Sequence, residues 1–199
     1  ENINKFNKIK KKILQTNKLN VHKYIIPIKS YKKNKFNFFE YRDFGIYIWK
    51  NDKYFFSFRL IREYDKKFTS HYHFDQFSNV LLIGKKFLIS DPGTYCYSSN
   101  KFFRNYMRSY KAHFTPIDIN LKSDTDIFAK IDFPYPEVIL LNRYCYLTKA
   151  KINEQIYYAG FINKGNKFEI YHFTKKKQKK LKINIYNSPG YGLLRSNKL

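Results

Sequence analysis

Short runs of aromatic and β-branched residues, each ended by turn residues, restrict the fold of this chain more than any other feature of its sequence. From Tyr24 onward these runs recur in the pattern of many short strands. Aromatic residues make up 20% of the chain, and their rings pack well on a pleated sheet. Three pairs of runs flank short connections and predict hairpins: residues 45–50 and 53–59 around Asn51-Asp52, residues 79–83 and 87–90 around Gly84-Lys85, and residues 155–162 and 167–173 around 163–166. We therefore predict an all-β, antiparallel fold.

The N-terminal residues follow a different pattern. Apolar residues stand at helical spacing among lysines and predict one amphipathic helix: Ile3, Phe6, Ile9, Ile13 and Leu14. We expect residues 1–22 to be a helix or linker from an upstream domain and residues 23–199 to form the β domain, with a solvated basic tail as the alternative. The chain begins with Glu1 rather than Met, so we expect its true N-terminus further upstream. No apolar run reaches the roughly 18 residues that a membrane helix needs, and no transmembrane segment is predicted.

The net charge of +24 favours binding to an anionic partner. Codon bias in an AT-rich genome would produce the same excess of Lys, Asn, Ile, Phe and Tyr. The basic run at residues 175–180 could bind phosphate or sulfate, or form a solvated turn. Aromatic residues are spread along alternating strands rather than gathered in a base-stacking motif, so no nucleic-acid partner is predicted. Cys96 and Cys145 fit no metal spacing and either pair or stay free.

Three of the five histidines share one stretch of the chain with an aspartate. In a strand, residues two apart point to the same face, so His71 and His73 would lie side by side, about 7 Å apart. One imidazole could then bind a metal while the other faces a substrate. Asp91 lies one hairpin further on, and His113 would complete a three-ligand zinc site with water in the fourth position. The simpler alternative is a pair of ordinary surface or hydrogen-bonded histidines.

A second metal site is compatible with the same residues. His73, Asp75 and His113 match the two-histidine, one-carboxylate set of non-haem iron oxygenases. The downstream arginine expected for a keto-acid cosubstrate is not evident, so this interpretation ranks second. The sequence has neither a glycine-rich phosphate loop nor a Gly-x-Ser-x-Gly elbow, and nucleotide hydrolysis and serine hydrolase chemistry have no support.

The whole stretch from His71 to Thr115 resembles the heparinase II/III-like family. The order and spacing of the family's motifs agree throughout, and one departure is Phe114, where the family commonly has Asn. The chain reads His71-Tyr72-His73-Phe74-Asp75-Gln76-Phe77-Ser78, then Gly84, then Asp91-Pro92-Gly93-Thr94-Tyr95-Cys96-Tyr97, then Arg104-Asn105-Tyr106-Met107-Arg108-Ser109, and then Ala112-His113-Phe114-Thr115. The closing Ser188-Pro189-Gly190-Tyr191-Gly192 also resembles the family's C-terminal end, though weakly.

The resemblance implies the C-terminal antiparallel β-sandwich of a bacterial polysaccharide lyase that acts on uronic-acid polysaccharides by β-elimination. In such proteins an upstream α/α toroid supplies an Asn and a Tyr that have no counterpart here, so this chain alone is expected to be inactive or nearly so. The resemblance also implies one structural zinc ion per chain, an acidic polysaccharide as partner, and a location in the periplasm or cell envelope. A non-catalytic carbohydrate-binding or cell-envelope protein with the same sandwich is the alternative.

The resemblance further assigns roles to individual residues. His71 matches the histidine that reaches into the cleft, while His73, Asp91 and His113 match the metal ligands. A neutral histidine can act as base or as donor to the substrate carboxylate. Arg104 and Arg108 are candidates for gripping carboxylate or sulfate, and Tyr106 is a second catalytic candidate; salt bridging and packing are the ordinary alternatives for these three.

Overall fold

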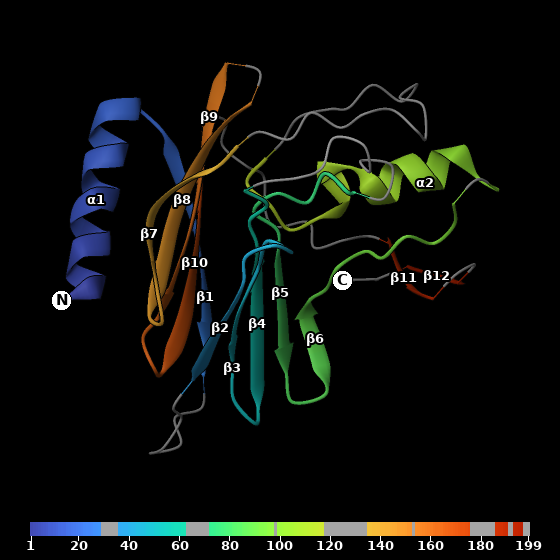
Figure 1. The fold of residues 1–199 in the computed structure, drawn as a ribbon, viewed down its shortest axis with the longest axis horizontal. Helices are drawn as coiled ribbons and strands as arrows, with labels where there is room; N and C mark the ends of the chain where they lie inside the picture. Colours follow the sequence, from blue (N-terminus) through green and yellow to red (C-terminus); the bar gives the residue numbers. More distant parts are fainter. Residues whose placement is uncertain are drawn as a thin grey trace. The chain divides into compact units, whose positions relative to one another are not determined.

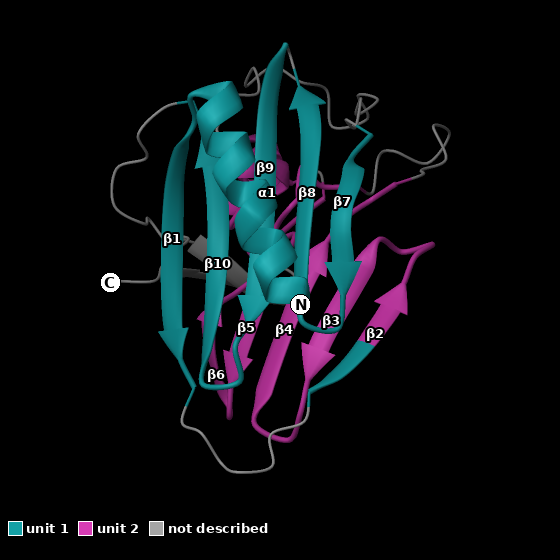
Figure 2. Ribbon diagram, turned by 90° about the vertical axis from the view of Figure 1, so that its left-hand side faces the viewer, with its two compact units in different colours: residues 1–38, 134–181 teal, residues 39–133, 182–199 magenta. Residues whose placement is uncertain are grey.

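The structure is a computed structural model, and it describes residues 1–28, 36–62, 72–97, 99–117, 135–152, 154–175, 186–190 and 193–196. The chain divides into two compact units, coloured separately in Figure 2. Unit 1 consists of residues 1–38 and 134–181, and unit 2 consists of residues 39–133 and 182–199.

Unit 1 is a five-stranded antiparallel sheet with one helix, α1 (Asn2–Asn17), on one face (Figures 1 and 2). The strand order is β1 (Asn20–Pro27), β10 (Lys167–Thr174), β9 (Gln155–Asn163), β8 (Cys145–Ile152), β7 (Glu137–Asn142). Phe6 of α1 is fully buried and its ring centroid lies 5.2 Å from that of Tyr171 on β10. A Cβ on Gly160 of β9 would come within 2.8 Å of the Phe6 ring, so glycine lets the helix approach the sheet this closely.

Unit 2 contains a second five-stranded antiparallel sheet. Its strand order is β2 (Asn37–Tyr41), β3 (Ile46–Lys50), β4 (Tyr54–Arg59), β5 (Asn79–Ile83), β6 (Lys86–Ile89). The chain continues through α2 (Lys101–Arg108) and a 3₁₀ turn (Tyr110–Ala112), and the last strands, β11 (Tyr186–Gly190) and β12 (Leu193–Ser196), pair with each other. The core side chains of this sheet alternate along the strands, as a half-buried sheet requires: Tyr47, Trp49, Phe56, Phe58 and Leu81.

The prediction of an all-β, antiparallel fold is confirmed, and two five-stranded sheets are consistent with the expected β-sandwich. All three predicted hairpins are present, as β3–β4, β5–β6 and β9–β10. The N-terminal helix is confirmed as well. It contributes Phe6 to the core of unit 1. Within the described residues, no helix is long and apolar enough to cross a membrane.

Candidate functional site

The candidate site lies in unit 2, where the segment of residues 72–78 docks on α2. The backbone N–H of Phe74 donates to the Arg108 carbonyl at 2.6 Å, and the Arg108 side chain donates through Nε to the Tyr72 carbonyl at 3.1 Å. These bonds fix the backbone on both sides of His73. The expectation that His71 and His73 share a strand is wrong for His73, because residues 72 and 73 are not in a strand. His71 itself lies outside the described residues.

The end of this segment is fixed by an unusual backbone conformation at Phe77. Its φ is +67°, a region that costs a residue with a side chain roughly 1 kcal/mol or more. The Phe77 N–H donates to the Arg59 carbonyl at 2.9 Å, and its ring stacks on Phe58 with centroids 6.2 Å apart. These contacts hold the turn that leads from His73 into β5.

His113 follows the 3₁₀ turn, and its ring orientation is set by Ser109. The ring Nδ1 lies 2.8 Å from the Ser109 carbonyl oxygen, which can only accept, so Nδ1 carries the hydrogen. In the neutral ring the lone pair is therefore on Nε2. This atom is buried and makes no hydrogen bond to any described residue. His113 thus presents a buried nitrogen lone pair suited to a cation.

Asp91 faces that lone pair from the loop after β6. Its Oδ1 accepts a hydrogen bond from the Gly93 N–H at 2.8 Å, and Gly93 has a φ of +71°, which glycine adopts at little cost. The other oxygen, Oδ2, lies 3.6 Å from Nε2 of His113. This distance is too long for a hydrogen bond. The Asp-Pro-Gly turn therefore orients the carboxylate toward His113 without bonding it directly.

His73 completes the group. Its ring centroid lies 5.5 Å from that of His113, with the rings at 72° to each other. Burial lowers the pKa of His73 to about 3, and His113, Arg104 and Arg108 act in the same direction, against the opposing effect of Asp91. His73 is therefore neutral at physiological pH, the form in which imidazole binds metals.

The spacing of these side chains can be compared with a zinc site. Two atoms bound at 2.0–2.1 Å to a tetrahedral zinc ion lie about 3.3 Å apart, and two imidazole centroids on such an ion lie roughly 5 Å apart. The 3.6 Å and 5.5 Å separations of the Asp91–His113 and His73–His113 pairs are close to these values. However, no three or more His, Cys, Asp or Glu side chains among the described residues are arranged to hold a metal ion. The separations within the Asp91–His113 and His73–His113 pairs are therefore close to those of a zinc site, but the three side chains together do not surround a common metal position.

Asp75, the carboxylate ligand of the alternative iron site, forms an ion pair with Arg59. Its Oδ2 lies 3.3 Å from Nε of Arg59. Burial raises the pKa of Asp75, whereas Arg59 and His113 oppose this. Because Arg59 neutralises the Asp75 carboxylate, the geometry does not favour the iron ligands His73, Asp75 and His113 over the zinc ligands, which have Asp91 in place of Asp75.

The two arginines of α2 lie together on one buried face. Arg104 and Arg108 are four residues apart and only 5% and 4% exposed. Burial lowers the pKa of Arg108 to about 10, and Arg104 adds to this, so Arg108 remains charged at neutral pH. Tyr106 is two residues from each arginine, about 200° around the helix, so α2 does not present it on the same side.

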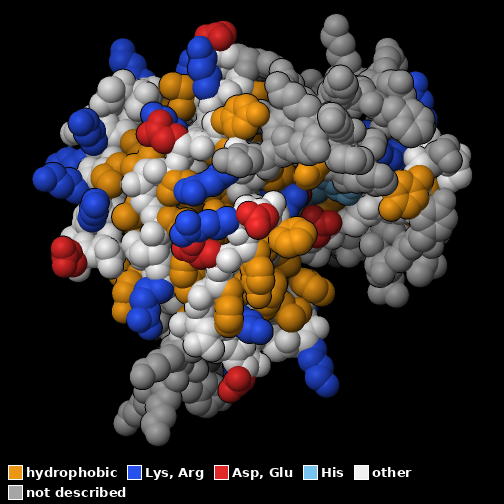
Figure 3. Space-filling model, in the orientation of Figure 1, with side chains coloured by type: hydrophobic (Ala, Val, Ile, Leu, Met, Phe, Trp, Pro, Cys, Tyr) orange, Lys and Arg blue, Asp and Glu red, His pale blue; other side chains and the backbone are white. Residues whose placement is uncertain are grey.

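A small cavity opens beside the carboxylates of the site. It measures about 170 Å³, and its lining includes Arg59, Asp75 and Asp91. Figure 3 shows a small group of pale-blue histidine atoms beside acidic and basic side chains on the face in view. The volume is below the 300–1,000 Å³ of typical ligand pockets. This cavity is therefore too small to enclose a ligand of ordinary size.

Several supporting residues were not singled out from the sequence. Ser109 sets the tautomer of His113, and its place in the Arg-Ser motif was the available signal. The Gln76 side chain pairs with Ile61, donating to its carbonyl and accepting from its N–H, both at 2.8 Å. Thr115 donates to the Gln76 carbonyl at 2.7 Å. Phe114, the departure from the family motif, accepts the Asn79 N–H through its carbonyl at 3.2 Å. These contacts tie the loops around the site to β5 and the preceding segment.

The cysteines and the remaining predicted residues are also placed. Cys96 and Cys145 are both buried free thiols. Tyr95 packs edge-on against Phe103 with centroids 5.3 Å apart. Of the basic run at residues 175–180, residues 176–180 lie outside the described residues.

Comparison with known proteins gives one family. Residues 33–117 match the family model described as heparinase II/III-like, C-terminal. No curated protein and no solved structure matches the chain significantly. The matched residues include every candidate site residue, from His71 to His113.

Proposed function

We propose that this chain is the C-terminal part of a polysaccharide lyase that cleaves uronic-acid polysaccharides by β-elimination. The observation that carries the proposal is the family match over residues 33–117, which contains the whole cluster of polar residues around His113. Within that match, the chain brings two buried arginines and two histidines close enough to influence one another.

The reaction explains why these residue types are needed. β-Elimination removes the proton at C5 beside a carboxylate, so the site must neutralise that carboxylate, supply a base and protonate the leaving oxygen. Arg104 and Arg108 supply positive charge suited to a carboxylate or sulfate. His71 is assigned as the base or as a donor to the carboxylate, and Tyr106 as a second proton-transfer group.

We assign a structural zinc ion to His73, Asp91 and His113. The neutral state of His73, the lone pair on His113 Nε2 and the orientation of Asp91 support this assignment. When bound, the ion would hold the loop after β6, the segment before β5 and the residues after α2 together.

The partners of this chain are assigned by the same reasoning. An upstream α/α toroid would supply the missing Asn and Tyr, and an acidic polysaccharide would bind between that domain and this one. The excess of basic residues, which gives a net charge of +24, favours a polyanionic substrate. Such a protein would act in the periplasm or cell envelope, where these polymers are met.

A non-catalytic carbohydrate-binding protein is the second candidate. The position of Tyr106 supports it, because Tyr106 lies about 200° around α2 from each arginine, so a sugar held by the arginines would not meet Tyr106. In this case the unit would bind the polymer without breaking it.

Enzyme assays separate the two candidates. The protein extended by its upstream coding region would be incubated with heparin, heparan sulfate, hyaluronan, chondroitin and alginate, and unsaturated uronate ends would be followed by ultraviolet absorbance. We expect one of these polymers to be cleaved by the extended protein and little cleavage by the 199-residue chain. Binding without cleavage by the extended protein would favour the second candidate. Robust cleavage by the 199-residue chain would contradict the assignment of a shared site.

A further inference from the structure

Unit 1 contains a cluster of lysines gathered around one buried carboxylate, Glu169 of β10. The ammonium groups of three lysines lie close to the same oxygen, Oε1, at 3.0 Å for Lys23, 3.2 Å for Lys164 and 3.5 Å for Lys167. Glu169 is fully buried, whereas the three lysine side chains are 32–38% exposed. The carboxylate therefore holds three ammonium groups in place at the surface.

Tyr171 extends the cluster toward α1. Its hydroxyl donates to the second oxygen of Glu169 at 2.6 Å, and the Lys10 ammonium lies 4.9 Å from the centroid of its ring. Lys23 also lies over this ring, at 5.7 Å. The lysine cluster, defined as Lys10, Lys23, Lys164 and Lys167, thus has a rigid support of one carboxylate and one aromatic ring.

The cluster carries more positive charge than it neutralises. Four lysines surround one carboxylate, which leaves an excess of three positive charges. Burial lowers the pKa of Lys10, and Lys23 and Lys164 lower it further. Such crowding is relieved when an anion binds, because each ammonium group then gains an opposite charge.

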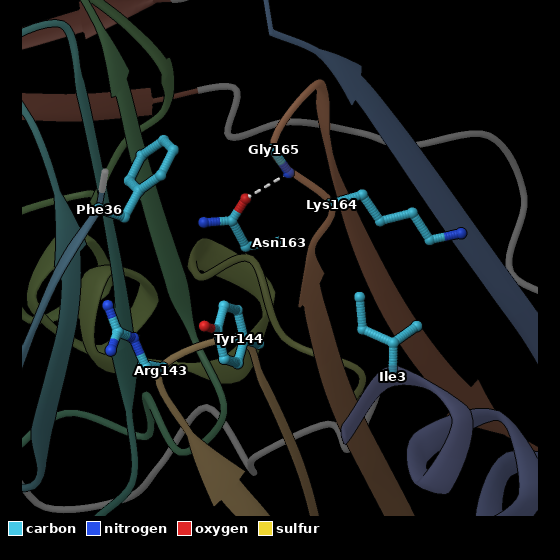
Figure 4. A pocket seen from close by; sticks show the side chains of 7 residues that line it. All are labelled: Ile3, Phe36, Arg143, Tyr144, Asn163, Lys164 and Gly165. Carbon is cyan, nitrogen blue, oxygen red and sulfur yellow. Dashed lines mark hydrogen bonds between the residues drawn. The ribbon is translucent and has the colours of Figure 1, made fainter. Parts of the chain in front are cut away.

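A pocket adjoins the cluster through Lys164 (Figure 4). Its volume is about 430 Å³, within the range of ligand pockets. In Figure 4 the Lys164 side chain extends away from the pocket centre, while Tyr144 and Arg143 line the opposite side. The Asn163 side chain is held by a hydrogen bond from the Gly165 N–H to Oδ1, at 2.9 Å. The pocket therefore offers an aromatic face and polar groups beside a concentrated positive charge.

We propose that the lysine cluster and this pocket form a second glycan-binding site, which holds a sulfated or carboxylated sugar at a position separate from the candidate catalytic residues. An acidic group of the sugar would bind the ammonium groups, and a sugar ring would lie against Tyr144, which is 44% exposed. The choice of an acidic glycan rests on the proposed function. The site itself rests on unit 1 alone, whose residues take no part in the chemistry assigned to unit 2.

The geometry favours a glycan over nucleic acid. Glu169 Oε1 holds three ammonium groups within 3.5 Å of itself, so the positive charge forms one compact patch, which suits a single sulfate or carboxylate better than a row of phosphates along a backbone. Nucleic-acid grooves instead combine an extended basic track with several stacking rings. Only one exposed ring, that of Tyr144, lines this pocket among the described residues.

Calorimetric titration of the 199-residue chain with a size-defined heparin oligosaccharide tests the proposal. The test variant is Lys23→Gln with Lys164→Gln, which leaves Lys167 and Tyr171 on Glu169. The matched control is Lys85→Gln with Lys86→Gln, two exposed lysines of unit 2. Loss of two charge contacts is expected to weaken binding about tenfold in the test variant, with less than about twofold change in the control. Equal weakening in both variants would overturn the proposal.

Two further measurements, lysine acetylation and competition by DNA, test the same proposal without using a variant. Acetylation of the unmodified chain should show Lys23 and Lys164 protected by the oligosaccharide and Lys85 and Lys86 unprotected, a readout that needs no variant to fold. Equal protection of all four would overturn the proposal, as would equally strong competition by a DNA oligonucleotide of the same charge. None of these experiments measures cleavage. A negative binding result would therefore disprove this site without bearing on the lyase assignment, and a negative cleavage result would disprove the lyase assignment without bearing on this site.

Discussion

Nε2 of His113 lies 3.6 Å from Oδ2 of Asp91, too far for a hydrogen bond and close to the separation of two ligands on one zinc ion. The other ring nitrogen donates to a backbone carbonyl, so the lone pair of His113 points into this gap. A lone pair and a carboxylate held this way repel each other unless a proton or a cation lies between them. The zinc assignment therefore has a local electrostatic reason in addition to the family resemblance.

Removal of His113 should abolish zinc binding. We expect the unmodified chain to retain about one zinc ion after purification, because tetrahedral structural sites bind tightly. His113→Ala and Asp91→Asn should each retain much less, measured by elemental analysis after dialysis against a weak chelator. His22→Gln, a change in unit 1, is the control and should retain the full amount. Equal zinc content in all four proteins would contradict the assignment.

Gln76 should be important for stability. Its fully buried side chain makes two hydrogen bonds with Ile61, both 2.8 Å long. Gln76→Ala leaves two buried backbone groups without these partners, and a loss of about 2–4 kcal/mol in the free energy of unfolding is expected. Urea denaturation measures this loss. Gln155→Ala, at a partly exposed strand end, should cost less than about 1 kcal/mol, and similar losses in the two variants would be evidence against this role.

Gly160 should not tolerate a side chain. A Cβ there would lie 2.8 Å from the Phe6 ring, and the resulting overpacking is expected to cost about 1–3 kcal/mol in Gly160→Ala. Shortening the facing side chain should recover part of this cost, so Gly160→Ala with Phe6→Leu should destabilise less than the sum of the single variants. Thermal denaturation of the four proteins completes the cycle. Strict additivity would show that the helix does not press on β9 at this position.

Acid should weaken unit 1 through Glu169. Burial alone would raise the pKa of Glu169, but contacts with Tyr171, Lys23 and Lys164 outweigh it and lower the pKa to about 2. A carboxylate with a depressed folded-state pKa stabilises the fold above its unfolded pKa, near 4.5, and loses this contribution as the pH falls toward 2. Unfolding free energies measured between pH 5.5 and 2.5 should therefore fall less steeply in Glu169→Gln. Parallel curves for the two proteins would rule out this linkage.

The sequence predicted local features well. Hairpins and the N-terminal helix follow from short patterns of apolar and turn residues, and they occur where the patterns placed them. His113 and its partner Ser109 are also close in sequence, only four residues apart. The features that could not be predicted from the sequence depend on contacts between residues distant in the chain. His73 lies outside a strand because its neighbours bond to Arg108, 36 residues away from Tyr72, and no local pattern encodes that contact.

The lysine cluster illustrates the same limit. Lys10, Lys23 and Lys164 come from a helix, a strand and a turn. The pairing of β1 with β10 brings Lys23 to Glu169, and the β9–β10 hairpin brings Lys164. In the sequence they are three of many lysines, and codon bias explains their number without explaining their position. The arrangement of the charges, rather than their count, is what distinguishes a binding site from composition.

Mass spectrometry of the reaction products tests the lyase assignment most directly. β-Elimination splits the polymer without adding water, so the masses of the two product chains sum to the mass of the substrate, and one chain carries an unsaturated uronate. Hydrolysis would add one water molecule to that sum. We predict unsaturated products without added water when the extended protein acts on a defined uronate oligosaccharide, and their loss in Arg108→Gln. Hydrated products, or no cleavage of any uronate polymer, would contradict the assignment.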